Sequence, residues 1–341
     1  MEVATVGLDL AKHVFQVHCA DAQGRPVIRK RLRRTQVQAF FEALPPCRVG
    51  MEACASAHHW ARELSKLGHR VRLVPPQYVR PFVKTNKNDA ADAEAICEAI
   101  QRPTMRFVPA KSVDQQAVLT LHRSRDLLVR QRTMLVNALR GHCAEFGLIG
   151  SQGRQGVQTL IELVRTGSTQ LPELAQAALG FVVSEIASIS DQIKQIEIKL
   201  RAWHRQNPDS QRLATIPGVG LIVATALSAT IGSATQFRSG RPLAAWIGLV
   251  PRQFSTGGKP KLGGISKRGD GYLRRLLIHG ARSVLLRHYT GEARSTWVAG
   301  LTSRRSTNIA TVAIANKNAR IAWAVLTRSV TYEPAKTSLA G

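Results

Sequence analysis

The sequence predicts an α/β domain at the N-terminus, an α-helical middle region and a mostly α-helical C-terminal region. Three observations predict this division of the 341 residues. Short apolar runs alternate with helical patterns in the first third, apolar residues then recur at heptad spacing, and turns rich in Gly and Pro separate the later helices. We expect domains at residues 1–110, 111–207 and 208–330, followed by a patternless tail at 331–341.

The N-terminal domain begins with three apolar runs, at residues 3–10, 13–20 and 26–33, which predict antiparallel strands joined by tight turns. The elements expected next are a helix at 35–44, a strand at 47–52, a helix at 56–67, a strand at 71–74, and helices from 77 and at 88–101. This alternation of strands and helices supports the α/β class. The order is also that of an RNase H-like fold, a mixed sheet with helices on its faces, but that specific topology depends on a family resemblance carried by motifs and not on the alternation.

The middle region is predicted to contain two long helices. Leu121, Leu128 and Leu135 recur every seven residues within a helical pattern at 112–146. A second stripe steps by four and three residues through Val182, Ile186, Ile189, Ile193, Ile196, Leu200 and Trp203. This spacing predicts a coiled coil, within one chain or between chains, although an amphipathic helix in a bundle has the same pattern. The Gly-, Ser- and Gln-rich segment 150–156 is expected to be a loop.

The C-terminal region begins with a segment at 213–224 that resembles a helix-hairpin-helix element. In such an element, Gly218 and Gly220 would let backbone amides approach a phosphate at a helix N-terminus. A plain tight turn between apolar helices is the alternative. A loop at 251–261, a basic segment at 263–269 and helices at 272–288 and 308–327 are expected to follow.

Charge is the unusual feature of the composition. Lys and Arg number 48 against 22 Asp and Glu, a net charge of +26, and from residue 211 onward there are 19 basic and 3 acidic residues. Such a surface attracts polyanions, whereas an ordinary soluble surface mixes both signs, so nucleic acid is the expected partner. The five cysteines include no CxxC pair, no secretory leader is evident, and no apolar run reaches about 18 residues. We therefore expect a cytoplasmic protein with no membrane partner.

Four acidic residues of the N-terminal domain are candidate metal ligands. Asp9 ends an apolar strand, Glu52 ends another, and Asp89 and Asp92 share one face at the start of a helix. Carboxylate oxygens are the ligands that Mg²⁺ prefers, and two such ions can stabilise the attacking and leaving oxygens of a phosphodiester. Each acid also has an ordinary structural interpretation. Asp89 would serve as a helix cap, Asp92 as a first-turn acid, and the other two as turn or strand-end residues.

A second candidate site lies in the glycine-rich stretch 254–259. Ser255 would be exposed there as a nucleophile if a base or a metal ion activated it, or the stretch would be a turn that only touches the DNA backbone. Basic residues surround the stretch and are candidates for phosphate binding, namely Arg252, Lys259, Lys261, Lys267 and Arg268.

Five motifs in order along the chain carry a resemblance to a known family. They are GLDLAK at 7–12, MEACAS at 51–56, KNDAADA at 87–93, IPGVG at 216–220 and GLVPRQFSTGG at 248–258. Together they are similar to the DEDD transposases of the IS110 insertion-sequence family, and most of all to its IS1111 branch. The likeness covers nearly the whole chain.

The resemblance implies a RuvC-like domain of the RNase H type, a coiled-coil middle and a C-terminal transposase domain. It implies that Asp9, Glu52, Asp89 and Asp92 are the DEDD residues that bind Mg²⁺, and that a serine forms a transient phosphoserine link to DNA. That serine corresponds to Ser255, although a shift of one residue would select Thr256.

The family is also guided by a structured non-coding bridge RNA that pairs with donor and target DNA. The implied assembly is a homodimer that pairs into a tetramer on DNA at the bacterial nucleoid. Two other functions remain open. One is a RuvC-like Holliday-junction nuclease that uses water, and the other is a non-catalytic nucleic-acid-binding protein.

Overall fold

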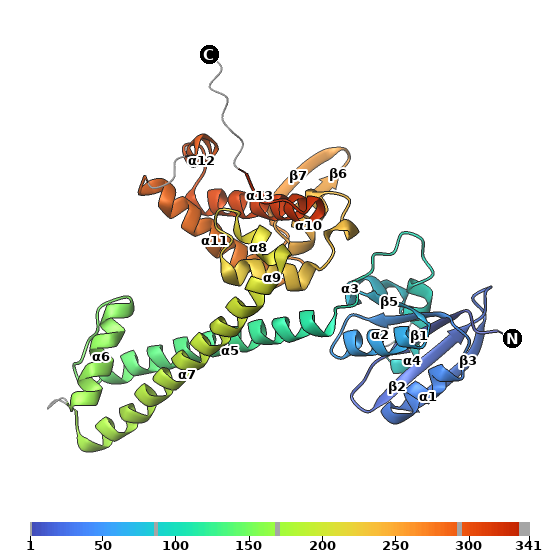
Figure 1. Cartoon of the computed structure of the whole chain (residues 1–341), viewed down its shortest axis with the longest axis horizontal. Helices are drawn as coiled ribbons and strands as arrows, with labels where there is room; N and C mark the ends of the chain where they lie inside the picture. The colour runs from blue at the N-terminus through green and yellow to red at the C-terminus, as the bar shows by residue number, and fades with distance from the viewer. Residues whose placement is uncertain (1, 85–87, 168–170, 292–294, 334–341) are drawn as a thin grey trace, which may run out of the picture. The chain divides into compact units, whose positions relative to one another are not determined.

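The chain divides into two compact units, residues 1–114 and 115–341. The computed structural model describes residues 2–84, 88–167, 171–291 and 295–333 (Figure 1). Lys87, the first residue of one motif, lies outside the described residues, as does most of the expected tail. The expected boundary near residue 207 lies inside the second unit. The division into three domains remains a prediction.

The first unit is built on a five-stranded mixed sheet with the strand order β3-β2-β1-β4-β5. The strands are β1 (Thr5–Asp9), β2 (Val14–Ala20), β3 (Pro26–Arg33), β4 (Arg48–Glu52) and β5 (Arg70–Val74). β1, β2 and β3 pair antiparallel, whereas β1, β4 and β5 pair parallel. The sequence therefore predicted all five strands and their order along the chain.

Helices cover both faces of this sheet. α1 (Val37–Glu42) and α2 (Ala57–Lys66) pack against the alternate side chains of β1, β2 and β4 in one apolar core. α4 (Asp89–Ala99) packs on the opposite face, where it contacts β1 and β2 most extensively, and the short α3 (Pro76–Val79) lies beside it. Short 3₁₀ turns at Arg34–Gln36 and Arg80–Phe82 adjoin α1 and α3.

Two long helices, α5 (Val113–Ala144) and α7 (Glu173–Gln206), form the first part of the second unit (Figure 1). They pack together in one cluster around Leu139 and Val183 and in another around Val118 and Leu200. Most of the apolar stripe predicted on α7 is buried, including Ile186, Ile189 and Ile193. The predicted loop at 150–156 is partly wrong, because α6 (Arg154–Thr166) begins inside it and packs on α7.

The rest of the second unit is mostly helical, as expected. Its helices are α8 (Pro208–Ala214), α9 (Leu221–Ile231), α10 (Gly240–Ile247), α11 (Gly271–Tyr289), α12 (Thr296–Thr302) and α13 (Thr307–Arg328), with a 3₁₀ turn at Ala234–Gln236. They share one apolar core. Two strands, β6 (Pro251–Thr256) and β7 (Lys259–Ile265), form an antiparallel hairpin. The sequence predicted a loop there, and that prediction is wrong.

Among the described residues, α7 is the one helix long and apolar enough to cross a membrane by length and composition. Its buried residues pack against α5 and α6, which is how an amphipathic helix of a helical bundle behaves. The absence of a membrane partner stays a prediction.

Candidate functional site

Asp9 lies at the carboxyl end of the central strand β1, between β2 and β4. Val6 and Leu8 are completely buried on the core side of the sheet, and they fix the register that places Asp9 on the opposite face. Its side chain is only partly exposed. Asp9 is therefore a strand residue and not the turn residue that was considered from the sequence.

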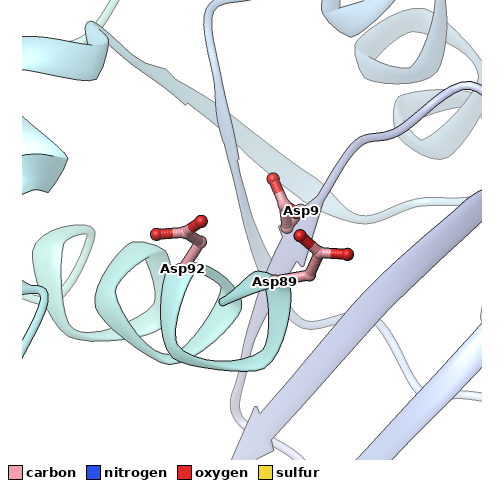
Figure 2. Close-up of side chains that lie close together, drawn as sticks. All are labelled: Asp9, Asp89 and Asp92. Carbon is pink, nitrogen blue, oxygen red and sulfur yellow. The ribbon is translucent and has the colours of Figure 1, made fainter. Parts of the chain in front are cut away.

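Asp89 and Asp92 reach Asp9 from the first turn of α4 (Figure 2). The backbone amide of Ala91 donates a hydrogen bond of 2.8 Å to the side-chain oxygen of Asn88, which makes Asn88 the N-cap of the helix. The cap role considered for Asp89 is thus filled by its neighbour. One carboxylate oxygen from each of Asp9, Asp89 and Asp92 lies within 4.8 Å of the other two.

Two glycines on adjacent strands allow α4 to come this close to the sheet. Gly7 and Gly50 are paired in register on β1 and β4. A Cβ on Gly7 would stand 2.0 Å from the carbonyl oxygen of Ala93, and one on Gly50 would stand 2.6 Å from the Ile100 side chain. Because real Cβ atoms do not approach other atoms so closely, these glycines set the height of α4 above the sheet and thereby the separation of the three aspartates.

Burial, together with the like charges around it, shifts the pKa of Asp9. The pKa of Asp9 is raised from its ordinary value of 3.8 to about 6. Burial is the largest cause, followed by repulsion from Asp92, Asp89 and Glu52, and a hydrogen bond from the Leu10 backbone acts in the opposite direction. Because the cluster disfavours negative charge on Asp9, binding of a cation at this position would be favourable.

Glu52 ends β4, the parallel neighbour of β1, so the predicted adjacency of Glu52 and Asp9 at one sheet edge is confirmed. Glu52 is near enough to repel the charge on Asp9, but it lies outside the set of oxygens within 4.8 Å. The donor set consists of hard carboxylate oxygens, with no His or Cys in the group, which fits Mg²⁺ or Mn²⁺ better than zinc.

The hairpin of the second unit carries Ser255 and Thr256. Gly257 and Gly258 form its turn with φ of +57° and +76°, the left-handed conformation that two-residue hairpin turns require. Since side chains alternate along a strand, Ser255 and Thr256 point to opposite faces of the hairpin. Nε2 of Gln253 donates a hydrogen bond of 2.8 Å to the Ser255 hydroxyl, which confirms that these two residues share a face.

The cations of the hairpin lie mainly on the face that holds Thr256. Thr256 pairs with Lys259, and Phe254 pairs with Lys261, so these four side chains share that face. All of them are exposed, as is Arg252. The basic and aromatic side chains together form a surface suited to phosphates and stacked bases.

Lys267 and Arg268 lie in the connection between β7 and α11. Lys267 has φ of +55°, a left-handed conformation that is uncommon for a non-glycine residue, and its amide donates to the Gly248 carbonyl oxygen. The carbonyl oxygen of Arg268 accepts a hydrogen bond from Arg274, and Asp270 caps α11. Both basic side chains are exposed and remain candidates for phosphate contact.

The turn between α8 and α9 uses its glycines in two different ways. A Cβ on Gly218 would stand 2.6 Å from the Gly280 carbonyl oxygen of α11, and its φ is +83°, so this glycine is needed for packing. Gly220 caps α9, and a Cβ there would meet no atom within 4 Å. The space beside Gly220 is therefore open to a phosphate, whereas the space beside Gly218 is filled by the backbone of α11.

Two features were not predicted from the sequence. One is the close approach of α4 to Gly7 and Gly50, which together form the glycine seat of this helix, and the other is the row of arginines on β3. No local pattern could have found the glycine seat, because its partner α4 begins 39 residues after Gly50 and still further from Gly7 in the sequence. The run Arg29-Lys-Arg-Leu-Arg33 was a usable signal for a basic strand at the sheet edge.

Comparison with known proteins connects both sites to one family. Residues 6–146 match the DEDD transposase family of IS110, and residues 210–297 match the family described as Transposase IS116/IS110/IS902. A probable family 20 transposase of Pseudomonas aeruginosa is 52% identical over 338 residues, covering 98% of this chain and 100% of the relative. The chain belongs to the IS110 family of transposases.

Two further relatives of this chain are transposases of insertion-sequence elements. The transposase of IS1328 from Yersinia enterocolitica is 44% identical, over 97% of this chain and 98% of its own length. The transposase of IS1111A from Coxiella burnetii is 42% identical, over 97% and 92%. Membership in this transposase family implies an enzyme that cleaves DNA and transfers strands.

Proposed function

We propose that the chain is a Mg²⁺-dependent DNA recombinase in which four acidic residues hold the metal and Ser255 attacks the scissile phosphate. The observation that carries the proposal is the convergence of Asp9, Asp89 and Asp92, whose oxygens lie within 4.8 Å of one another. Glu52, at the end of the adjacent strand, is the proposed fourth ligand. Mg²⁺ bound there would neutralise charge that develops on the phosphate oxygens.

The chemical step is a transfer of the phosphodiester to the protein and back. The Ser255 oxygen forms a bond to phosphorus while a phosphorus–oxygen bond of the DNA backbone breaks. The serine hydroxyl loses its proton, and the departing DNA oxygen gains one. A hydroxyl of a second DNA strand then attacks the phosphoserine. Its oxygen bonds to phosphorus and loses its proton, the bond from phosphorus to the serine oxygen breaks, and Ser255 regains a proton, so that the strands are joined with no net oxidation and no free double-strand ends.

The opposite orientations of Ser255 and Thr256 make the choice of nucleophile testable. DNA with a cleavable but non-rejoinable site should trap a covalent adduct that survives denaturing electrophoresis. We expect Ser255→Ala to abolish this adduct and Thr256→Ala to retain it. The reverse result would assign the nucleophile to Thr256. Retention of the adduct in both variants would exclude a hairpin nucleophile.

A RuvC-like junction nuclease that uses water is the second candidate function. It is favoured by one feature of the hairpin, since the hydrogen-bond partner of the Ser255 hydroxyl is the amide of Gln253, which is no base. If wild-type protein cleaves junction DNA in Mg²⁺ but leaves no adduct, this function is correct. A non-catalytic DNA-binding protein would do neither, and EDTA would change nothing.

Nucleic-acid partners follow from the charge of the second unit. From residue 211 onward 19 basic residues face 3 acidic ones, and the hairpin cations are exposed. We propose donor DNA, target DNA and a structured bridge RNA as the partners. A protein that leaves sequence recognition to base pairing needs to bind backbone and helix shape, and a broadly basic surface does so.

The proposed assembly is a homodimer that pairs into a tetramer through a coiled coil of α5 and α7. Large apolar side chains on these helices are exposed, among them Met134, Phe181 and Ile198. Contact with another copy of the chain would remove these apolar side chains from water. Light scattering of the free protein and of its DNA complex should give masses of two and four chains.

The remaining proposals concern fold and location. The strand order β3-β2-β1-β4-β5, with two antiparallel and two parallel pairings, supports an RNase H-like, RuvC-like first unit. The α8–α9 turn with Gly220 at a helix start supports a helix-hairpin-helix element. All five cysteines are free, in keeping with action in the reducing cytoplasm at the nucleoid.

A further inference from the structure

Three arginines of β3 lie on the same face of the sheet as the acid cluster. Arg29, Arg31 and Arg33 occupy alternate positions of the edge strand and are exposed. Alternate residues of a strand share a face. Arg29 forms an ion pair of 3.6 Å with Glu94 of α4, which identifies that face as the one α4 covers.

Strand register places Arg31 in the same transverse row as Asp9. Asp9 pairs with Gln16 of β2, and Gln16 pairs with Arg31 of β3. Two strand spacings separate Asp9 from Arg31, which is about 10 Å between backbones. Arg33 pairs with Val14 and lies one step further toward the end of the sheet at which the acids gather.

The three arginines differ in how their charge is compensated. Arg29 has Glu94 as its partner, and Glu94 is also bound by Lys84 at 2.8 Å. Arg31 and Arg33 form no ion pair within the described part of the chain. Two uncompensated guanidinium groups thus lie within a few residue spacings of three carboxylates without neutralising them.

Basic residues on an edge strand have an ordinary use, because charge there discourages pairing with another sheet edge. That use requires charge on the strand but no particular face. Lys30 lies on the opposite face, 5.9 Å from the ring of Phe40, and its charge would discourage edge pairing equally well. The face and register shared by Arg31, Arg33 and Asp9 call for a further explanation.

We propose that Arg31 and Arg33 bind the phosphodiester backbone of the DNA strand whose scissile phosphate reaches the Asp9 cluster. The planar guanidinium of arginine donates two parallel hydrogen bonds to a phosphate, and a row of two such groups holds consecutive phosphates in one orientation. The inference rests on the proposed function, because it uses the acid cluster as the position of the scissile phosphate.

The test compares two full-length variants that lose the same charge. One is Arg31→Gln with Arg33→Gln. The control is Arg25→Gln with Lys66→Gln, whose exposed side chains lie at the opposite end of the sheet and on α2. DNA affinity is measured by fluorescence anisotropy over a series of salt concentrations in EDTA, so that no chemistry contributes, and circular dichroism verifies folding.

We expect the Arg31/Arg33 variant to bind DNA about tenfold more weakly than wild type. The slope of log K against log salt concentration should become shallower by about 1.5, because each lost phosphate contact removes one unit or slightly less. The control should change both quantities much less. Arg31→Lys with Arg33→Lys should restore the slope and only part of the affinity, because lysine keeps the charge but lacks the two parallel hydrogen-bond donors of the guanidinium group.

Equal behaviour of the arginine variant and the control would overturn the proposal. Normal DNA binding by the arginine variant together with self-association would also overturn the proposal, because the arginines would then serve only to protect the sheet edge. A loss of affinity for RNA but not for DNA would overturn it as well. Failure of the proposed function is distinguishable, since Asp9→Asn tests the metal chemistry by strand transfer while the arginine variants are judged by binding in EDTA.

Discussion

The acid cluster of the first unit and the hairpin of the second carry the proposed reactive groups, and they are built in opposite ways. Asp9 is partly buried, and the glycine seat and the start of α4 hold it close to two other acids. Ser255 lies on a two-stranded hairpin whose β6 side chains are all exposed. Packing fixes the first site before any ligand arrives, whereas strand pairing and a two-glycine turn alone shape the second.

Because the two sites are built differently, mutations in the acid cluster and mutations on the hairpin should have different consequences. In the acid cluster, function and stability are coupled, because the fold partly buries Asp9 and also holds it near like charges that repel it. On the hairpin they are separable, because its exposed side chains contribute little to a core. Variants at the two sites should therefore differ in stability as well as in activity.

The largest effect is expected from Asp9→Asn. Losing the central carboxylate should lower strand transfer by about 10³-fold or more, since stabilisation of the transition-state charge would be lost. Assays with defined donor and target DNA measure it. The matched control is Glu98→Gln on α4, a residue paired with Arg102, which should retain nearly full activity. Equal losses in both variants would show that the loss is not specific to the proposed metal ligand.

The glycine seat should be nearly as sensitive. Gly7→Ala places a Cβ against the backbone of α4 and should cost about 1–3 kcal/mol in the free energy of unfolding or more, together with loss of metal binding. Gly50→Ala meets the side chains of Ile100 and Ile96 and no backbone atom among its nearest contacts, and side chains can shift, so its cost should be smaller. Chemical denaturation measures both. A larger loss for Gly50→Ala would contradict the seat as described.

The pH dependence of stability should reveal the strain in the acid cluster. Because the folded-state pKa of Asp9 is about 6, above its ordinary 3.8, the folded protein binds more protons than the unfolded chain between these values. Without metal, stability should fall as pH rises from about 4 to 6, by on the order of 1–2 kcal/mol after allowance for partial exposure. Above pH 6 the loss is complete, and Mg²⁺ should reverse it.

Asp9→Asn isolates this contribution from others. His122 in the second unit is buried between Tyr272 and Thr225, and burial lowers its pKa to about 4. A neutral buried histidine makes stability rise with pH between about 4 and 6.5, opposite to Asp9. The difference between wild type and Asp9→Asn removes the His122 effect. A difference that does not vary with pH would contradict the raised pKa.

The smallest effect is expected on the hairpin. Lys259→Gln with Lys261→Gln should weaken DNA binding several-fold and reduce the salt slope by one to two, with the free energy of unfolding changed by less than about 0.5 kcal/mol. Anisotropy titrations and denaturation measure the two quantities. A clear loss of stability would show that the hairpin packs more tightly than its exposure indicates.

The sequence allowed prediction of the first unit more fully than of the second. Apolar runs ending in Asp9 and Glu52 predicted the strands and the adjacency of these two acids. The convergence of Asp89 and Asp92 on Asp9 was implied by the family resemblance, because spacing alone left each acid an ordinary structural role. The hairpin was missed because its exposed side chains show no alternation of apolar and polar residues, and only Gly257-Gly258 signalled a turn. The approach of α4 to Gly7 was unpredictable, since it depends on a contact between segments distant in sequence.

Metal binding by the acid cluster tests the central claim most directly. Crystals of the full chain grown with millimolar Mn²⁺ and measured by anomalous diffraction should show an ion about 2–2.3 Å from oxygens of Asp9, Asp89 and Asp92, absent in Asp9→Asn. A wild-type map with no ion at this position, and with the three carboxylates separated or paired with basic side chains, would contradict the account.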